Sequence, residues 1–390
     1  MQTEKWDIGF SIEQAAHTAV SASFKPFVTY SHVRGKMDRG CKSDYANLWL
    51  DMVIVVDTSK HMSDHQLKLV KASIISMFNH KTRIGANYDD PRSTRVGIVT
   101  YNRNATVIAD LDKFNSTSDL YAGLENLSNT DSDKADLVEG LSKAGEVLAA
   151  GRSNGYRSNY PQMIVLYAAS YHKFAFDSLD VAQRQQAENI SLAVVNMNDT
   201  STIIHDNLEK LSPKMYHKYS INTSRDLLWD AAKVNCFCKT GLPHDHYHFN
   251  LGTCLDVSTG KKSWNAASEA CKTKNGHLVH EKSFMRSGRV EYLLKSTNAS
   301  YGGYHIGVHK KDGVWVWEQP AGQELILEEN ADQFINWNPG FPIENDTHTA
   351  VATTFKPFGP NMLWENVDPN VDERFYICET ITCDTDNYCP

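Results

Sequence analysis

The stretch "LWLDMVIVVDTS", residues 48–59, decides how the first half of this 390-residue chain folds. Its apolar run, interrupted only by Asp51, ends where Asp57, Thr58 and Ser59 begin a polar turn. A near-continuous apolar run rich in valine and isoleucine predicts a buried strand inside a sheet. Ligands of open α/β sheets usually lie at the carboxyl ends of strands, so the polar turn is the first place to look for a site.

The same pattern continues outward from this strand across residues 46–235. Apolar runs that predict strands alternate with segments whose apolar residues recur at helical spacing. The predicted strands cover residues 48–56, 94–101, 105–111, 162–170, 190–197 and, more weakly, 214–220, and the predicted helices cover residues 65–78, 118–127, 135–150, 178–189, 200–211 and 224–235. We expect Ser63 and Ser224 to cap the first and last helices. This alternation predicts an α/β fold with a doubly wound, mostly parallel sheet.

Residues 236–390 have a different character. They contain seven of the eight cysteines. Two predicted helices, around residues 263–276 and 288–297, are followed by short strands and long loops, which is an α+β pattern. We therefore divide the chain into an N-terminal tail at residues 1–45, a first domain at 46–235 and a second domain at 236–390.

Composition narrows the class of partner. The chain is 41% hydrophobic and 22% charged, which is ordinary for folded protein. Its net charge of −8 disfavours nucleic acid and anionic membranes as partners. No apolar run is long enough to predict a membrane span.

Cysteines and glycosylation motifs indicate an extracellular protein. The cysteine count is even and no Cys-x-x-Cys pair occurs, which favours disulfides in an oxidising compartment. Asn-x-Ser/Thr motifs are in excess. The glycosylation candidates are Asn104, Asn115, Asn126, Asn198, Asn222, Asn298 and Asn345. The N-terminal sequence "MQTEKWDIGFSIEQAAHTAV" shows no signal peptide, so the extracellular prediction depends on the cysteines and the motifs.

The first domain resembles the von Willebrand factor A family. The resemblance lies in "WLDMVIVVDTS", "TRVGIVTYNRNA" and "MIVLYAAS" and covers about residues 46–235. It implies a Rossmann-like fold and a magnesium adhesion site built on Asp-x-Ser-x-Ser, a threonine and a second aspartate. Asp57 and Ser59 match this site, but His61, Ala135 and Ala168 stand at the other three positions.

This partial match leaves three interpretations of Asp57 and Ser59. We expect the family fold without the family metal, because one carboxylate and one hydroxyl rarely offset the cost of dehydrating magnesium. Asp57 would then bond the turn or cap the next helix. The alternatives are residual magnesium binding at Asp57 and Ser59, or a softer ion such as zinc on Asp57 and His61.

The second domain resembles the C-type lectin-like family. The stretches that carry the resemblance are "GTCLDVSTGKKSWNAASEACKTKNGHLV", "YHIGVHKKDGVWVWEQP", "FINWNPGFP" and "MLWENVD…RFYICE". The resemblance implies two disulfides, Cys271–Cys378 and Cys238–Cys254, while the family's second bridge is missing. For the remaining cysteines we expect Cys41–Cys236, which would flank the first domain, and Cys383–Cys389, which would close a small tail loop.

The lectin resemblance also implies where calcium and sugar would bind, and the sequence is altered there. The family's Glu-Pro-Asn loop is replaced by Phe341-Pro342-Ile343, although Glu365 and Asn366 follow Trp364 as in calcium-binding members. We expect no cofactor, with calcium on a rearranged site as the alternative. The candidate ligand-binding residues are Phe341, Glu344, Asn345, Glu365 and Asn366, with Phe358 as a further apolar contact.

Two other motifs are weaker. "PHDHYHF" gathers His244, Asp245, His246 and His248, which could hold a metal, although a solvated loop is the simpler interpretation. "GRSNG", residues 151–155, matches a hydrolase pattern but follows a predicted helix where that motif requires a strand, so Gly151 is expected to end the helix. We predict no catalytic residues and no enzyme.

The predicted function is therefore recognition. The domain pair resembles a nematode group of lectin-like proteins, many linked to defence against microbes. This resemblance implies a secreted protein that binds glycoconjugates or proteins in innate immunity without the usual calcium or magnesium sites. The alternatives are an adhesion or matrix protein that works by protein contacts, and a calcium-dependent carbohydrate-binding lectin.

Overall fold

The structure is a computed structural model of the chain. It describes residues 40–79, 81–171, 176–198, 200–239, 252–295, 303–318, 325–327, 334–355 and 362–390. Four sequence predictions lie outside these residues: most of the N-terminal tail, the histidine cluster at residues 244–248, Asn298 and Phe358.

The first domain is built around one six-stranded sheet with the strand order β3-β2-β1-β4-β5-β6. The strands are β1 (Asp51–Asp57), β2 (Arg95–Tyr101), β3 (Ala105–Ala109), β4 (Gln162–Ala168), β5 (Ile190–Asn196) and β6 (Tyr216–Lys218). All neighbours pair in parallel except the edge strand β3, which is antiparallel to β2. Every residue of β1 is buried, as its apolar run requires for a central strand. The predicted fold class is confirmed.

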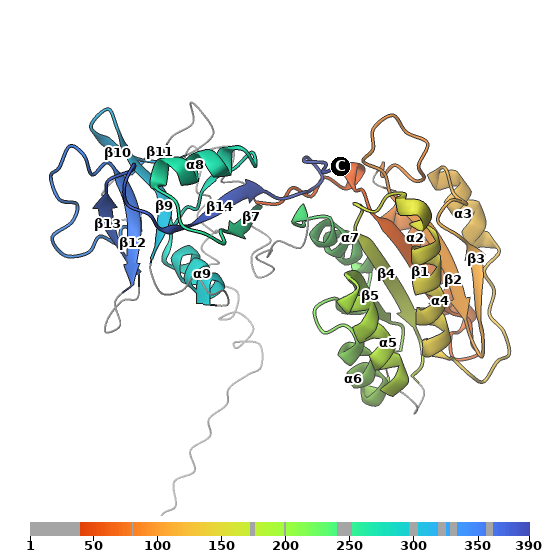
Figure 1. Cartoon of the computed structure of the whole chain (residues 1–390). Coiled ribbons are helices and arrows are strands. Elements are labelled where there is room, and N and C mark those ends of the chain that lie inside the picture. The colour runs from red at the N-terminus through yellow and green to blue at the C-terminus, as the bar shows by residue number, and fades with distance from the viewer. Residues whose placement is uncertain are drawn as a thin grey trace, which may run out of the picture. The chain divides into compact units, whose positions relative to one another are not determined.

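Helices cover both faces of this sheet (Figure 1). One face packs α2 (Asp64–Met77), α3 (Thr117–Glu125) and α7 (Thr223–Val234) against side chains such as Ile54. The other packs α4 (Leu137–Ala150), α5 (Phe176–Ala187) and α6 (Thr202–Leu211) against side chains such as Val55. Alternate residues of β1 thus serve two cores, and the turn after Asp57 lies at the sheet's carboxyl edge.

The two predicted helix caps had different outcomes. Ser63 caps α2 in a complete capping box with Gln66. The prediction for Ser224 was wrong, because α7 begins at Thr223 with Asn222 at the cap position. The Ser224 hydroxyl instead donates to the Ser73 carbonyl at 3.0 Å, so it joins α7 to α2.

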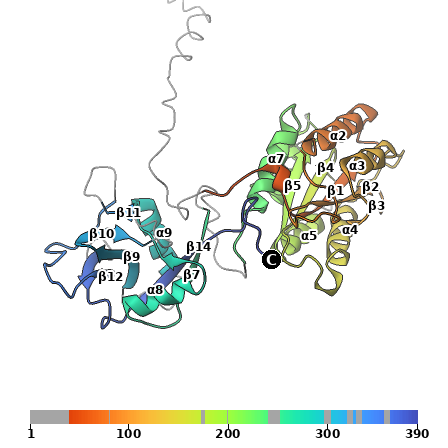
Figure 2. The same cartoon turned by 90° about the horizontal axis from the view of Figure 1, so that it is seen from above.

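In the residues that the structure describes, the second domain combines helices with short strands (Figure 2). The helices are α8 (Trp264–Lys272) and α9 (Phe284–Lys295). The strands are β7 (Thr253–Val257), β8 (His277–Leu278), β9 (Tyr304–Lys311), β10 (Val314–Trp317), β11 (Leu325–Ile326), β12 (Ala350–Phe355), β13 (Met362–Val367) and β14 (Phe375–Ile381). Strand β14 connects the strands of this domain, because it pairs with β7, β8 and β9. Trp317 and Trp364 meet edge to face in the core at 5.6 Å.

All eight cysteines are paired in the structure. The bonds are Cys41–Cys236, Cys238–Cys254, Cys271–Cys378 and Cys383–Cys389, which are the pairs expected from the sequence. Cys271–Cys378 fastens α8 to β14. In the described part of the chain, no helix combines the length and apolar character that crossing a membrane requires.

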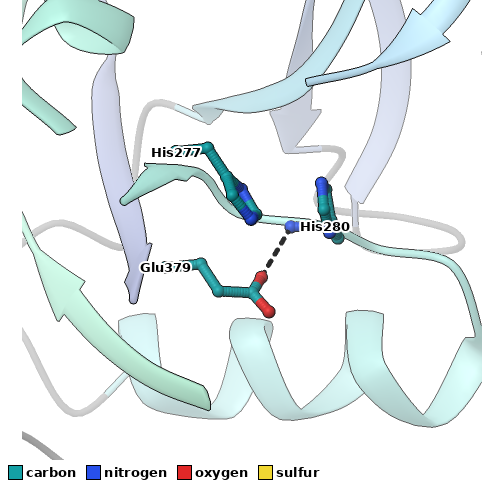
Figure 3. A group of neighbouring side chains, drawn as sticks. All are labelled: His277, His280 and Glu379. Carbon is teal, nitrogen blue, oxygen red and sulfur yellow. Dashed lines mark hydrogen bonds between the residues drawn. The ribbon is translucent and has the colours of Figure 1, made fainter. Parts of the chain in front are cut away.

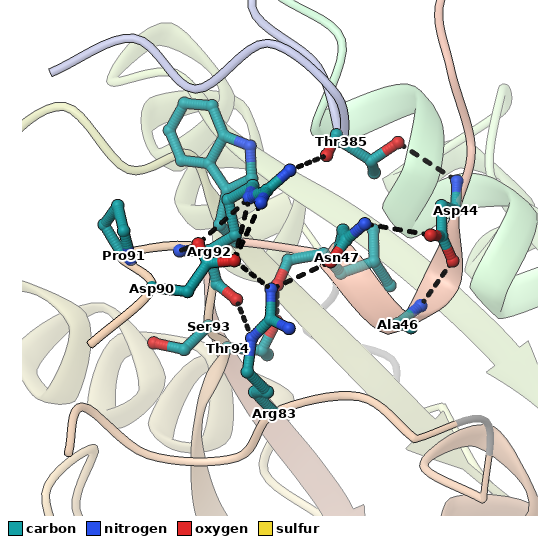
Figure 4. Close-up of polar contacts among 12 residues, drawn as sticks. Asp44, Ala46, Asn47, Arg83, Asp90, Pro91, Arg92, Ser93, Thr94 and Thr385 are labelled. Atoms are coloured by element: carbon teal, nitrogen blue, oxygen red, sulfur yellow. Dashed lines mark hydrogen bonds and ion pairs between the residues drawn. The ribbon is translucent and has the colours of Figure 1, made fainter. Parts of the chain in front are cut away.

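The last residues of the chain pack against the start of the first domain. The Trp49 indole is buried and lies 4.8 Å from the Tyr388 ring. The Thr385 hydroxyl accepts the Asp44 N–H at 3.0 Å, and its carbonyl accepts from Arg92 at 3.4 Å (Figure 4). The tail loop closed by Cys383–Cys389 is therefore structurally part of this region.

Candidate functional site

Asp57 sits at the carboxyl end of β1 with its carboxylate fully engaged by the protein. One oxygen, Oδ1, accepts the Ser59 N–H at 2.9 Å. The other, Oδ2, accepts the Ala169 N–H at 3.2 Å and the Ser170 hydroxyl at 3.4 Å. Burial raises the pKa of Asp57, and the hydrogen bonds from Ser59 and Ala169 oppose that shift only in part.

The ring of the histidine in this turn contacts a backbone carbonyl. The His61 ring nitrogen Nε2 lies 3.1 Å from the Asp133 carbonyl. A carbonyl only accepts hydrogen bonds, so this nitrogen carries the proton and is not a metal-binding atom in this arrangement. Ala135 and Ala168, at the other two family positions, are buried and carry no ligand atoms.

These contacts favour a structural role for Asp57 and Ser59. Asp57 ties the turn after β1 to the residues that follow β4, and the Ser59 hydroxyl accepts the His61 N–H at 3.3 Å. These hydrogen bonds of Asp57 and Ser59 help to hold the turn in place. Zinc on Asp57 and His61 stays a prediction, because a proton on Nε2 of the neutral ring leaves the lone pair on Nδ1.

The lectin-domain candidates around Glu365 are likewise bonded to the protein. Glu365 Oε1 accepts from the Asn338 side chain at 2.6 Å, and Oε2 accepts from the Thr354 hydroxyl at 2.8 Å. The loop between them contains the cis Phe341-Pro342 bond. The Glu365 carboxylate thus joins β12, β13 and this loop.

The Asn366 side chain forms hydrogen bonds with the backbone of the same loop. Its side-chain oxygen accepts the Ile343 N–H at 2.8 Å. Its amide donates to the carbonyls of Ile343 at 2.9 Å and His348 at 3.0 Å. Asn366 is buried, so the structure commits it to the loop backbone.

The remaining candidates face solvent to different degrees. Glu344 and Asn345 are exposed and Phe341 is half-buried, so these three lie on the outer side of the loop. Among the described glycosylation candidates, Asn104, Asn115, Asn126, Asn222 and Asn345 are exposed and Asn198 is half-buried. Their modification stays a prediction.

A further cluster was not predicted from the sequence. His277 on β8, His280 just after it and Glu379 on β14 bring their ligand atoms within 4.8 Å of one another, and all three are buried (Figure 3). The two histidines form a His-x-x-His pattern, but Glu379 is 99 residues from His280. Only the pairing of β14 with β8 brings them together, and no local sequence signal reveals that pairing.

Known protein families match both halves of the chain. The von Willebrand factor type A domain model matches residues 51–228, and the lectin C-type domain model matches residues 260–380. These are typically non-catalytic binding domains.

Individual relatives agree with this assignment. The C-type lectin domain-containing protein 160 of Caenorhabditis elegans is 26% identical over 388 residues, covering 90% of this chain and 56% of that protein. E-selectin of Sus scrofa is 27% identical over 128 residues, covering 33% of this chain and 24% of its own length. The chain thus spans little more than half of the first relative and a quarter of the second.

Among solved structures, proximal thread matrix protein 1 from the mussel byssus is similar with a TM-score of 0.39 and 13% identity. The match covers 49% of this chain and 46% of that one. Together the two domain types indicate extracellular recognition or adhesion. The chain carries a von Willebrand factor type A domain followed by a C-type lectin domain, in the order that the sequence predicts.

Proposed function

We propose that this chain is a non-catalytic extracellular recognition protein whose lectin domain binds a glycoconjugate or a protein surface without calcium. The observation that carries the proposal is the closed hydrogen-bond network of Glu365 and Asn366. In calcium-binding lectins, the equivalent carboxylate and amide oxygens coordinate the ion. Here these oxygens accept hydrogen bonds from Asn338, Thr354 and Ile343.

Calcium would have to compete with these bonds. It needs six to eight oxygen ligands, and Phe341 and Ile343 occupy the positions of two of them. Taking the Asn366 oxygen would leave the Ile343 N–H without its acceptor, at a cost of about 1–3 kcal/mol if that group stayed buried. The loop is therefore held in shape by two side chains of β13, Glu365 and Asn366.

The surface that this loop offers is mixed. The Ile343 side chain is 41% exposed and stands beside the exposed Glu344 and the half-buried Phe341. An apolar contact flanked by an acidic group suits either a sugar face or a protein surface. Innate defence is the biological setting implied by the resemblance to the nematode lectin-like group.

Binding with and without a chelator tests this function. The full secreted chain would be applied to a glycan array and to intact bacterial cells, in calcium and in EDTA. We expect the same bound ligands in both conditions. Binding that disappears in EDTA and returns with calcium would contradict the proposal.

Three variants test whether this loop makes the contact with the ligand. Ile343→Asp should weaken binding about tenfold or more, because it removes an apolar contact from the loop. Val371→Asp is the matched control, since Val371 is an exposed valine elsewhere in the same domain. Glu365→Gln keeps acceptor and donor groups for Asn338 and Thr354 but lacks the charge that calcium needs, so it should bind like the unaltered chain.

A further inference from the structure

The hydrogen-bond partners of His277 and His280 fix which ring nitrogens carry protons. His277 Nδ1 lies 2.7 Å from the Leu278 carbonyl, and His280 Nε2 lies 2.6 Å from the Glu318 carbonyl. Because a carbonyl only accepts, both of these nitrogens must donate. In the neutral rings, His277 Nε2 and His280 Nδ1 therefore carry lone pairs.

The His277 ring lies in the interior of the domain, where only 1% of the residue is exposed. Its Nε2 atom is buried and makes no hydrogen bond to any residue that the structure describes. The two rings stack with centroids 4.1 Å apart. A buried, neutral imidazole with an unused lone pair is a group that calls for a ligand.

Glu379 completes the cluster with a negative charge. Its Oε1 atom lies 2.9 Å from Arg286 Nη2, and its Oε2 atom accepts a hydrogen bond from the backbone N–H of His280 at 3.0 Å. Arg286 also donates to the Thr253 hydroxyl at 3.1 Å, so its position is fixed from two sides. Oε2 keeps a further lone pair.

We propose that His277 Nε2, His280 Nδ1 and Glu379 Oε2 bind a zinc ion that ties the segment around β8 to β14. Two imidazoles and a carboxylate form a common zinc ligand set. The hydrogen bonds from the other ring nitrogens to backbone carbonyls are the supporting contacts that orient metal-binding histidines. Neither the magnesium position of the first domain nor the calcium loop of the lectin domain contributes to this site.

The site is closed, so the zinc is structural. His277, His280 and Glu379 are each at most 3% exposed, so the protein shields these three side chains from solvent. The ion would sit beside the Cys271–Cys378 disulfide, where β14 meets β8, and would stabilise that junction. It would enter as the domain folds.

Metal analysis of the full chain tests the proposal. The protein would be secreted into zinc-supplemented medium, passed through metal-free buffer and measured by inductively coupled plasma mass spectrometry. We expect one zinc ion per chain. His277→Asn should remove it, because asparagine can replace the Nδ1 donor to Leu278 but not the Nε2 lone pair.

Matched controls separate this site from other histidines. His61→Asn and His205→Asn should keep the zinc, and His205 is informative because it forms a partly exposed cluster with Asp206 and Glu209 on α6. A chain with His244, His246 and His248 changed to asparagine should also keep it. Zinc that is lost from a control but kept in His277→Asn would overturn the proposal, as would an unaltered chain without zinc.

A second measurement covers a variant that fails to fold. The unaltered chain produced with cobalt in place of zinc should show visible absorption from cobalt bound by nitrogen and oxygen ligands. Treatment with a strong chelator at raised temperature should remove that absorption and lower the melting temperature. A melting temperature that stays the same after the metal has been removed would show that no metal stabilises this junction.

Discussion

Strand β1 carries a buried aspartate at each end, and the protein holds the two carboxylates differently. Asp51, at the start, forms a bidentate ion pair with Arg95 at 2.7 and 3.0 Å. It also accepts a hydrogen bond from Arg157 at 3.1 Å. Asp57, at the end, accepts from the backbone N–H groups of Ser59 and Ala169 and from the Ser170 hydroxyl. One strand thus presents the same side chain in a cationic and in a neutral setting.

The difference separates a structural charge from the remainder of a binding site. A buried carboxylate is stable when a cation balances it, and the two arginines do this for Asp51. At the other end, burial raises the pKa of Asp57, and the opposing effects come from Ser59, Ala169 and, least of all, the nearby His61. In the von Willebrand factor A resemblance, a metal ion would supply the balancing charge.

The largest effect on stability should come from changing Asp51, at the end of β1 where the carboxylate pairs with two arginines. Asp51→Ala leaves Arg95 and Arg157 buried without their shared carboxylate, so the free energy of unfolding should fall by about 3–5 kcal/mol. Urea unfolding of the full chain, followed by circular dichroism, measures this. Asp112→Ala is the control: it removes the exposed partner of Arg95 and should cost about 1 kcal/mol or less. Equal losses in the two variants would refute the comparison.

Asp57→Asn should have a smaller effect that depends on pH. Because burial raises the pKa of Asp57 above 3.8, the native state keeps a proton that the unfolded chain has already released. The unaltered chain therefore loses stability as pH rises from 3.8 through the raised pKa, while asparagine does not titrate. Relative to the unaltered chain, the free energy of unfolding of the variant should therefore rise across that range. Urea unfolding at a series of pH values measures it, with the exposed Asp131→Asn as control. A difference that stays constant with pH would contradict the assignment.

The fold was predictable because its signals are local. The apolar runs that became β1, β2, β4 and β5 are long enough to identify strands by themselves, and every residue of β1 is buried. The Ser63 cap was equally predictable, since its partner Gln66 is three residues away. Ser224 was misjudged because its hydroxyl found an acceptor on α2, which only the packing of the two helices creates.

The sites were less predictable because their partners are far apart in the sequence. Asp51 looked like an interruption of an apolar strand, yet its partner Arg157 is 106 residues away. The losses at His61, Ala135 and Ala168 could be read from the sequence because they fall on known family positions. No such pattern marks His277 and Glu379, which meet only through strand pairing.

Magnesium provides the smallest and most direct test of the neutral end. We expect about 10 mM magnesium to raise the stability of the unaltered chain by less than about 0.4 kcal/mol, the gain for a dissociation constant equal to that concentration. Thermal unfolding with and without the ion measures this. The informative variant is His61→Ser combined with Ala168→Asp, which returns a hydroxyl and a second carboxylate to family positions. Two buried carboxylates near each other repel, so this variant should be less stable than the unaltered chain without metal, and magnesium should restore part of the loss. Rescue of the variant alone would show that Asp57 still stands where a metal ligand belongs and that its neighbours have changed. Stabilisation of the unaltered chain to the same extent would show instead that the two ends of β1 differ less than their partners suggest.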